Sequence, residues 1–130
     1  MGSRITLSQR LNTAAGTDAR RYFGPSNDET WKLIGLTIIP NATSAANDTN
    51  YASIRAYKGA STAVMAARVT TTAGGALTQG TAEDLTLTGV GADLEITKAA
   101  PLSIRDDQSN GSGVITDYII TAEFERMGAF

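Results

Sequence analysis

The feature that most constrains the fold is the succession of short apolar segments that fills the chain after Trp31. Glycine, proline or small polar residues separate these segments, and within most of them apolar and polar side chains alternate. Alternation of this kind is typical of β-strands with one buried face, and no segment carries a convincing helical period. Regularly spaced strands of this length predict an all-β sandwich or barrel. We expect strands at 31–39, 51–58, 62–71, 84–88, 93–97, 101–104 and 115–126.

The chain is predicted to consist of an arm and one folded domain. With 130 residues it is large enough to bury a core without disulfide or metal crosslinks. Residues 30–130 form the predicted β-sandwich, whereas residues 1–29 show no sustained period and end in a turn cluster. If extended, residues 1–23 would span about 75 Å, so the arm could lie on a neighbouring molecule. A disordered tail is the alternative.

Charge is distributed unevenly along the chain. The whole chain has a net charge of −2, which argues against nucleic acid as the main partner. The first 23 residues nevertheless carry four arginines against Asp18 alone. A basic segment of this kind predicts contact with an acidic neighbour. The candidate partner-binding residues are Arg4, Arg10, Arg20 and Arg21.

The predicted strand at 31–39 is apolar on both faces. Strict alternation places Leu33 and Ile39 on one face and Ile34, Leu36 and Ile38 on the other. One face can cover the core, so the other needs cover from the arm, a second subunit or a partner. The candidate subunit-interface residues are Leu33, Ile34, Leu36 and Ile38.

The chain contains no cysteine and no histidine. It therefore lacks thiol and imidazole groups for nucleophilic catalysis and for metal binding. Glu123 and Glu125 share a strand face about 7 Å apart, a spacing at which two carboxylates can act on a glycoside. Because Phe124 takes the opposite face, the pair is better explained as the solvated face of a strand. We expect that the protein is not an enzyme.

A polar segment near the C-terminal end partly matches a calcium-binding loop. Asp106, Gln108, Asn110 and Asp117 stand where such a loop places oxygen ligands. Gln108 and the short Asp117 depart from the pattern, and no helices flank the segment. A polar turn between strands explains the same residues, so we expect no cofactor and no metal.

Three aromatic residues are candidates for stacking on a sugar ring, namely Trp31, Tyr51 and Tyr57. Trp31 begins a predicted core strand, so burial is the better interpretation for it. No apolar run approaches the ~20 residues that a membrane-spanning helix needs, and we expect no membrane partner.

Several segments follow one another in an informative order. They are TWKLIGL at 30–36, GTAEDLTL at 80–87, LEI at 94–96 and PLSI at 101–104, with a last strand that closes at Phe124. This order resembles that of the small jelly-roll head decoration, or cement, proteins of tailed bacteriophages. The resemblance covers most of 22–130 and rests on spacing rather than on a signature motif.

The residues indicate about eight strands, because the body has seven and the arm can add an eighth. The resemblance implies that they form a jelly-roll-like antiparallel β-sandwich with an extended N-terminal arm. It also implies a virion structural protein on the outer surface of the capsid, made in the host cytoplasm. Members of this family form trimers at local threefold positions and clamp neighbouring capsid subunits. The implied partners are therefore the major capsid protein and the chain itself, without nucleic acid or membrane.

Two other functions remain open from the residues alone. A carbohydrate-binding β-sandwich module, or a phage surface knob that adheres to host or environmental glycans, would need exposed aromatic rings in a row. Trp31 would be the residue that tests it. A glycosidase would rest only on Glu123 and Glu125.

Overall fold

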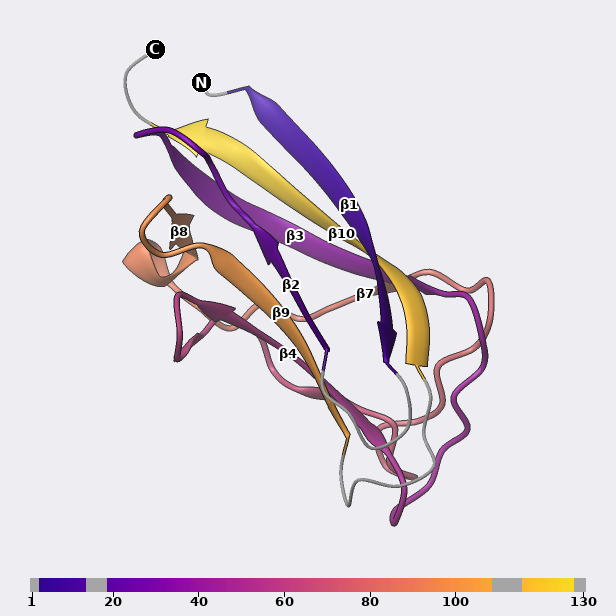
Figure 1. The fold of residues 1–130 in the computed structure, drawn as a ribbon. Helices are drawn as coiled ribbons and strands as arrows, with labels where there is room; N and C mark the ends of the chain where they lie inside the picture. Colours follow the sequence, from indigo (N-terminus) through magenta and orange to yellow (C-terminus); the bar gives the residue numbers. More distant parts are fainter. Residues whose placement is uncertain (1–2, 14–18, 109–115, 128–130) are drawn as a thin grey trace.

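The structure, a computed structural model, describes residues 3–13, 19–108 and 116–127. Its strands form two five-stranded sheets in which all pairings are antiparallel (Figure 1). The first, here the β1 sheet, has the order β1 (Arg4–Thr13), β10 (Thr116–Met127), β3 (Thr30–Pro40) and β7 (Glu83–Asp84), with β8 (Glu95–Ile96) also paired to β3. The second, here the β2 sheet, has the order β2 (Ala19–Phe23), β9 (Leu102–Gln108), β4 (Ala52–Lys58) and β5 (Thr62–Ala63), with β6 (Arg68–Val69) also paired to β4. A 3-10 helix, η1 (Gly91–Leu94), precedes β8.

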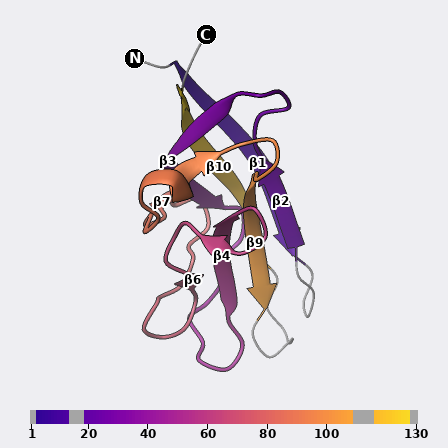
Figure 2. The same ribbon diagram turned by 90° about the vertical axis from the view of Figure 1, so that its left-hand side faces the viewer.

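The chain passes repeatedly from one sheet to the other. It crosses between β1 and β2, β2 and β3, and β3 and β4. It crosses again between β6 and β7, β8 and β9, and β9 and β10. The order β1-β10-β3-β7 against β2-β9-β4-β5 is that of a jelly roll, in which two Greek keys form a sandwich. Figure 2 shows β9 lying between β2 and β4. The predicted all-β, jelly-roll-like sandwich is confirmed.

The hydrophobic core lies between the two sheets. Alternate side chains of β10 face it, including the fully buried Ile120 and Phe124. Ile54 of β4 and Ile104 of β9 are also fully buried and belong to the same cluster. Trp31 packs on this core at the start of β3, with its ring centroid 5.4 Å from that of Phe124.

A β-bulge in β3 corrects the prediction of two apolar faces. Glu123 pairs with Gly35, but the next residue of β10, Phe124, pairs with Leu33, so Ile34 is an extra residue in the ladder. A bulge changes the phase of side-chain alternation. Leu33 on one side of it and Leu36 and Ile38 on the other are therefore all buried in the core. Of the four predicted subunit-interface residues, only Ile34 is not buried in the core.

The structure also corrects the prediction of an N-terminal arm, because most of the described part of 1–29 belongs to strands of the sandwich. All ten residues of β1 pair with β10, and all five residues of β2 pair with β9. Leu11 and Phe23 belong to the buried core. Gln9 interrupts the apolar alternation of β1, which hides the strand in the sequence. Its side-chain Nε2 donates to the main-chain oxygen of Tyr22 at 2.6 Å and links the two sheets.

Other predicted strands differ in length. The segment 62–71 contains two separate short strands, β5 and β6, rather than one. The segments 84–88 and 93–97 contribute only the two-residue strands β7 and β8. Alanine, threonine and glycine are frequent here. Val64, Met65 and Leu85 still reach the core, and polar contacts hold the rest of this part of the chain.

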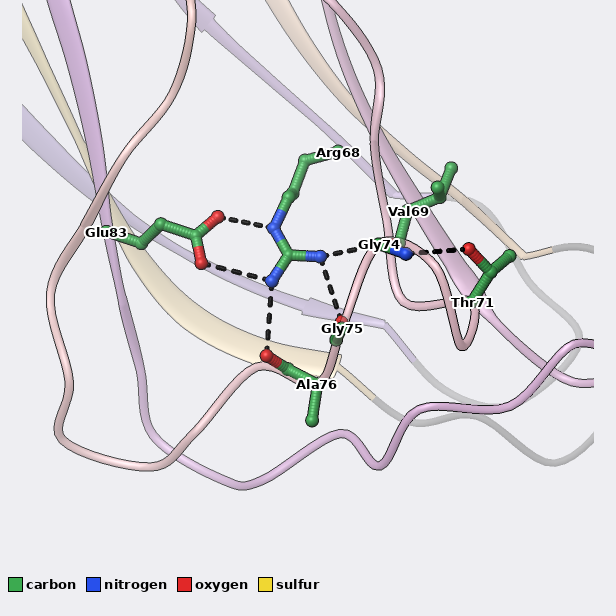
Figure 3. A network of polar contacts seen from close by, with 7 residues as sticks. All are labelled: Arg68, Val69, Thr71, Gly74, Gly75, Ala76 and Glu83. Carbon is green, nitrogen blue, oxygen red and sulfur yellow. Dashed lines mark hydrogen bonds and ion pairs between the residues drawn. The ribbon is translucent and has the colours of Figure 1, made fainter.

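Arg68 supplies many of those contacts (Figure 3). Its guanidinium pairs with both carboxylate oxygens of Glu83 and donates to the main-chain oxygens of Val69, Gly75 and Ala76. The last three hydrogen bonds measure 2.7, 3.0 and 3.1 Å. All five guanidinium N–H groups are used in this way. One side chain therefore holds the turn at 69–76 against the β1 sheet.

Deletion of residues 1–21 is expected to abolish cooperative folding. It removes β1, most of β2 and the buried Leu11, and it exposes one edge of β10. Circular dichroism during heating would show this as the loss of a sharp transition. Arg20→Gln in the full chain is the control and should melt as the parent does. A truncated chain with an unchanged transition would mean that the segment is a dispensable arm.

Arg68→Lys is expected to destabilise the protein by about 2 kcal/mol, because a lysine keeps the charge but cannot make five directed hydrogen bonds. Urea unfolding should show a lower midpoint with an unchanged slope. Arg55→Lys, at an exposed position, should change the stability by less than about 0.5 kcal/mol. Equal effects of the two substitutions would contradict the role assigned to Arg68.

Candidate functional site

Two of the predicted partner-binding arginines form ion pairs within the chain, on the outer face of the β1 sheet. Arg4 Nη1 donates to Glu123 Oε1 at 2.5 Å. Arg10 binds Asp117 through two hydrogen bonds, from Nε to Oδ1 at 2.9 Å and from Nη2 to Oδ2 at 2.6 Å. Both acidic partners belong to β10. Arg4 and Arg10 are therefore less available to an acidic neighbour than an extended arm would make them.

Asp117 is strongly stabilised in its ionised form. The hydrogen bonds from Arg10 lower its pKa most, and a hydrogen bond from Asn41 Nδ2 at 3.1 Å lowers it further, so that the pKa lies well below its usual range. The side chain is 17% exposed. The negative charge of Asp117 thus contributes to the folded state at neutral pH.

The other two predicted partner-binding arginines are neighbours in β2 but have different roles. Arg21 is half-buried, and its Nε donates to the main-chain oxygen of Arg10 at 2.9 Å. It thereby ties β2 of one sheet to β1 of the other. Arg20 is exposed on the outer face of the β2 sheet. Within the described residues it forms no ion pair.

Arg20 is the first member of a row of arginines that crosses three strands. The register pairs Arg20 with Arg105, and Arg105 with Arg55. Two positions further along β2 and β4, a second row contains Tyr22 and Tyr57 on either side of β9. Alternate residues of a strand share one side of a sheet, so both rows lie on the outer side. We call these five residues the arginine–tyrosine face.

Two hollows lie along the arginine–tyrosine face. One has a volume of about 290 Å³ and is lined by Arg20, Tyr22, Tyr57 and Arg105, together with Ser103 of β9 and residues of the neighbouring loops. The second has a volume of about 220 Å³ and is lined by Arg55 and Tyr57, together with small side chains and Met65. Because Tyr57 lines both, the hollows are neighbours on one surface.

The aromatic rings of this face differ in their surroundings. The side chain of Tyr22 is 55% exposed. Tyr57 is half-buried, and Cζ of Arg105 lies 5.7 Å from its ring centroid. This distance fits a cation–π contact that orients the guanidinium of Arg105.

Sequence reasoning missed most of this face. It singled out Tyr57 and Arg20 for separate reasons and did not consider Tyr22, Arg55 or Arg105. A local signal exists, since Arg-x-Tyr occurs at both 20–22 and 55–57 and places the two side chains on one side of a strand. The sequence does not show that β9 joins these two strands, and that pairing creates the face.

The two calcium-loop candidates that the structure describes in full, Asp106 and Asp117, are not brought together. Asp106 belongs to β9 rather than to a turn, and it is fully buried between the sheets. Asp117 lies on the outer face of the other sheet with Arg10. The side chain of Gln108 and the whole of Asn110 lie outside the described residues. In the described part of the chain, no group of three or more acidic, histidine or cysteine side chains could hold a metal ion.

Asp106 instead belongs to a buried polar cluster between β9 and β10. Its Oδ2 accepts a hydrogen bond from the Thr116 hydroxyl group. Tyr118 is fully buried nearby, and burial raises its pKa well above the usual range, with the charge of Asp106 acting in the same direction. The cluster joins strands of opposite sheets at one end of the sandwich, which indicates a structural role.

The remaining candidates are also accounted for. Glu123 and Glu125 lie on the outer face of β10, where Glu123 is paired with Arg4. Trp31 packs against Phe124 in the way expected of a core strand. Tyr51 is half-buried just before β4, outside the arginine–tyrosine face.

Comparison with known proteins gives no family for the chain: no protein-family model matches it, and neither does any curated protein. Among the described residues, no helix is both long enough and apolar enough to cross a membrane. The structure itself defines the class of the protein as an all-β, jelly-roll-like sandwich.

Asp117→Asn is expected to lower the melting temperature by a few degrees near neutral pH. The pKa of Asp117 is lower in the folded state than in the unfolded state, so its stabilisation is complete above about pH 4 and is lost as the pH falls below that value. The difference in melting temperature between the variant and the parent should therefore shrink in acid. Asp28→Asn removes the same charge from an exposed loop and is the control. A difference that stays constant with pH would contradict this assignment.

Proposed function

We propose that the chain is a virion structural protein: a capsid decoration, or cement, protein that binds the outer surface of a phage head. On this proposal it acts as a trimer and stabilises contacts between major capsid protein subunits. The observation that carries the proposal is the jelly-roll strand order, an arrangement that viral capsid proteins use. The order of the segments 30–36, 80–87, 94–96 and 101–104 adds the resemblance to phage decoration proteins. One fold serves many functions, so surface chemistry must support the proposal as well.

The acidic side chains support a structural role. Glu83 binds Arg68, Asp117 binds Arg10, Glu123 binds Arg4, and Asp106 accepts a hydrogen bond inside the sandwich. Each of these carboxylates already takes part in holding strands together. A bridging protein needs a stable body of this kind, because it works by making the opening of one subunit break contacts with several others.

The outer face of the β1 sheet also has an apolar spot that suits a contact between copies of the chain. Ile39 of β3 and Ile119 of β10 are opposite each other in the register. Ile39 is 41% exposed, although its neighbours on this face are mostly polar. We assign this spot, rather than the buried Leu33, Leu36 and Ile38, to the proposed trimer.

The chain is expected to form a trimer and to raise the temperature at which phage heads open when it is added to heads assembled without it. Light scattering after size-exclusion chromatography measures the first property. Cosedimentation and thermal opening of the heads measure the second. Ile39→Lys should produce a folded monomer that binds the heads less tightly.

Thr37→Lys introduces the same charge nearby on β3 and is the matched control. If it disrupts the trimer as strongly as Ile39→Lys does, the Ile39–Ile119 spot is not the contact. If the parent protein leaves the opening temperature of the heads unchanged, the proposal of a cement protein fails.

A second candidate function is the binding of glycans, and the arginine–tyrosine face specifically favours it. Tyr22 and Tyr57 border two neighbouring hollows on one sheet face. Aromatic rings beside a few polar groups are typical of sites that bind sugars and other small molecules. In this structure Tyr22, and not Trp31, is the residue that tests such a function.

A further inference from the structure

We propose that the arginine–tyrosine face binds an anionic saccharide, namely a chain of sugars that carry carboxylate groups, such as a polyuronate. This inference rests on the second candidate function and names the chemical class of its ligand. It does not depend on whether the protein binds a phage head.

The charge of the face is the first reason. Arg20, Arg105 and Arg55 are directly opposite one another on three adjacent strands. Like charges in opposite positions of a sheet destabilise it. Neither Arg20 nor Arg55 forms an ion pair with another described residue, whereas Arg4 and Arg10 on the other sheet each have an acidic partner. The exposed Arg20 and Arg55 are therefore the members of the row that can pair with an anionic ligand, whereas Arg105 is held between them by its contact with Tyr57.

The chemistry of the guanidinium group points to carboxylates. Arginine presents a planar fork of N–H donors that matches the two oxygens of a carboxylate. Adjacent strands lie about 4.8 Å apart, so the row from Arg20 to Arg55 extends over about 10 Å. A ligand that uses the whole row must carry more than one anionic group. A polymer with an acid on successive units meets this requirement.

The tyrosines and the hollows point to sugar rings. Tyr22 offers an exposed aromatic ring beside Arg20 on the same strand face. Tyr57 holds the guanidinium of Arg105 by a cation–π contact, so its role is to position that arginine. The two neighbouring hollows, of about 290 and 220 Å³, provide recessed space along the row of arginines. An acidic protein surface could bind the arginines, but it would make no use of the two hollows or of the exposed Tyr22 ring.

Isothermal titration calorimetry on the full chain tests the proposal with oligogalacturonate of about six units. The matched ligand is the same oligosaccharide with its carboxylates converted to methyl esters, which keeps the sugar rings and removes the charge. We expect binding of the acid form and a large loss of affinity for the ester. Arg55→Gln should weaken binding about tenfold, as should Arg20→Gln, because each removes a charge-assisted hydrogen bond.

Control variants separate the site from general charge. Arg4→Gln removes the same charge from the opposite sheet and should leave the affinity nearly unchanged. Tyr22→Ala should weaken binding while leaving the net charge intact. Circular dichroism verifies that each variant is folded. If Arg4→Gln weakens binding as much as Arg55→Gln does, the attraction is non-specific and the proposal is wrong.

The remaining outcomes are also decisive. If polyglutamate binds as tightly as oligogalacturonate, the face recognises an acidic peptide, and the proposal that its ligand is a saccharide is wrong. If the methyl ester binds as well as the acid, the protein does bind glycans, but the proposal that the ligand must be anionic is wrong. If neither oligosaccharide binds at millimolar concentration, both the anionic-saccharide proposal and the glycan-binding function are wrong. Binding of phage heads is measured separately and is unaffected by any of these results.

Discussion

The register between β3 and β10 is the constraint on which the rest of the sandwich depends. A slip of one residue would turn the whole apolar set of a strand to the wrong face. The bulge at Ile34 adds one residue to the ladder, so that Leu33 and Leu36 can face the same core from either side of it. What reads in the sequence as a strand with two apolar faces is thus a strand with one apolar face and one change of phase.

The arginines divide the outer surface into two chemically different faces. On the β1 sheet, Arg4 and Arg10 are neutralised by carboxylates of β10. The exposed pair of Arg4 with Glu123 contributes little to stability. The pair of Arg10 with the less exposed Asp117 contributes more, and both pairs leave that face without a strong field of one sign. On the β2 sheet, Arg20, Arg105 and Arg55 follow one another across three strands. The two exposed arginines of this row, Arg20 and Arg55, form no ion pair with another described residue, and they are the feature of this surface that most directly suggests a ligand.

The strands with strong alternation and large apolar side chains could be predicted from the sequence. The strands expected at 31–39, 51–58 and 115–126 match β3, β4 and β10 closely because periodicity is a local property. The bounds of β1 could not be predicted because Gln9 breaks its alternation. The polar turn expected from Asp106 onward is wrong at its start, because Asp106 continues β9 and its side chain is buried. The arginine–tyrosine face could not be predicted, since it requires the pairing of β2 and β4 with β9. That register depends on residues far apart in the chain.

The two proposed functions use opposite faces of the same sandwich and therefore do not compete. The Ile39–Ile119 spot lies on the β1 sheet and the arginine–tyrosine face lies on the β2 sheet, with the hydrophobic core between them. A trimer joined through the first face would carry three copies of the second. After one site has bound a polymeric ligand, the other two meet the same molecule at a high effective concentration. Each arginine–tyrosine face can then bind the ligand weakly on its own, because a trimer that engages three such faces would bind the polymer with higher overall affinity.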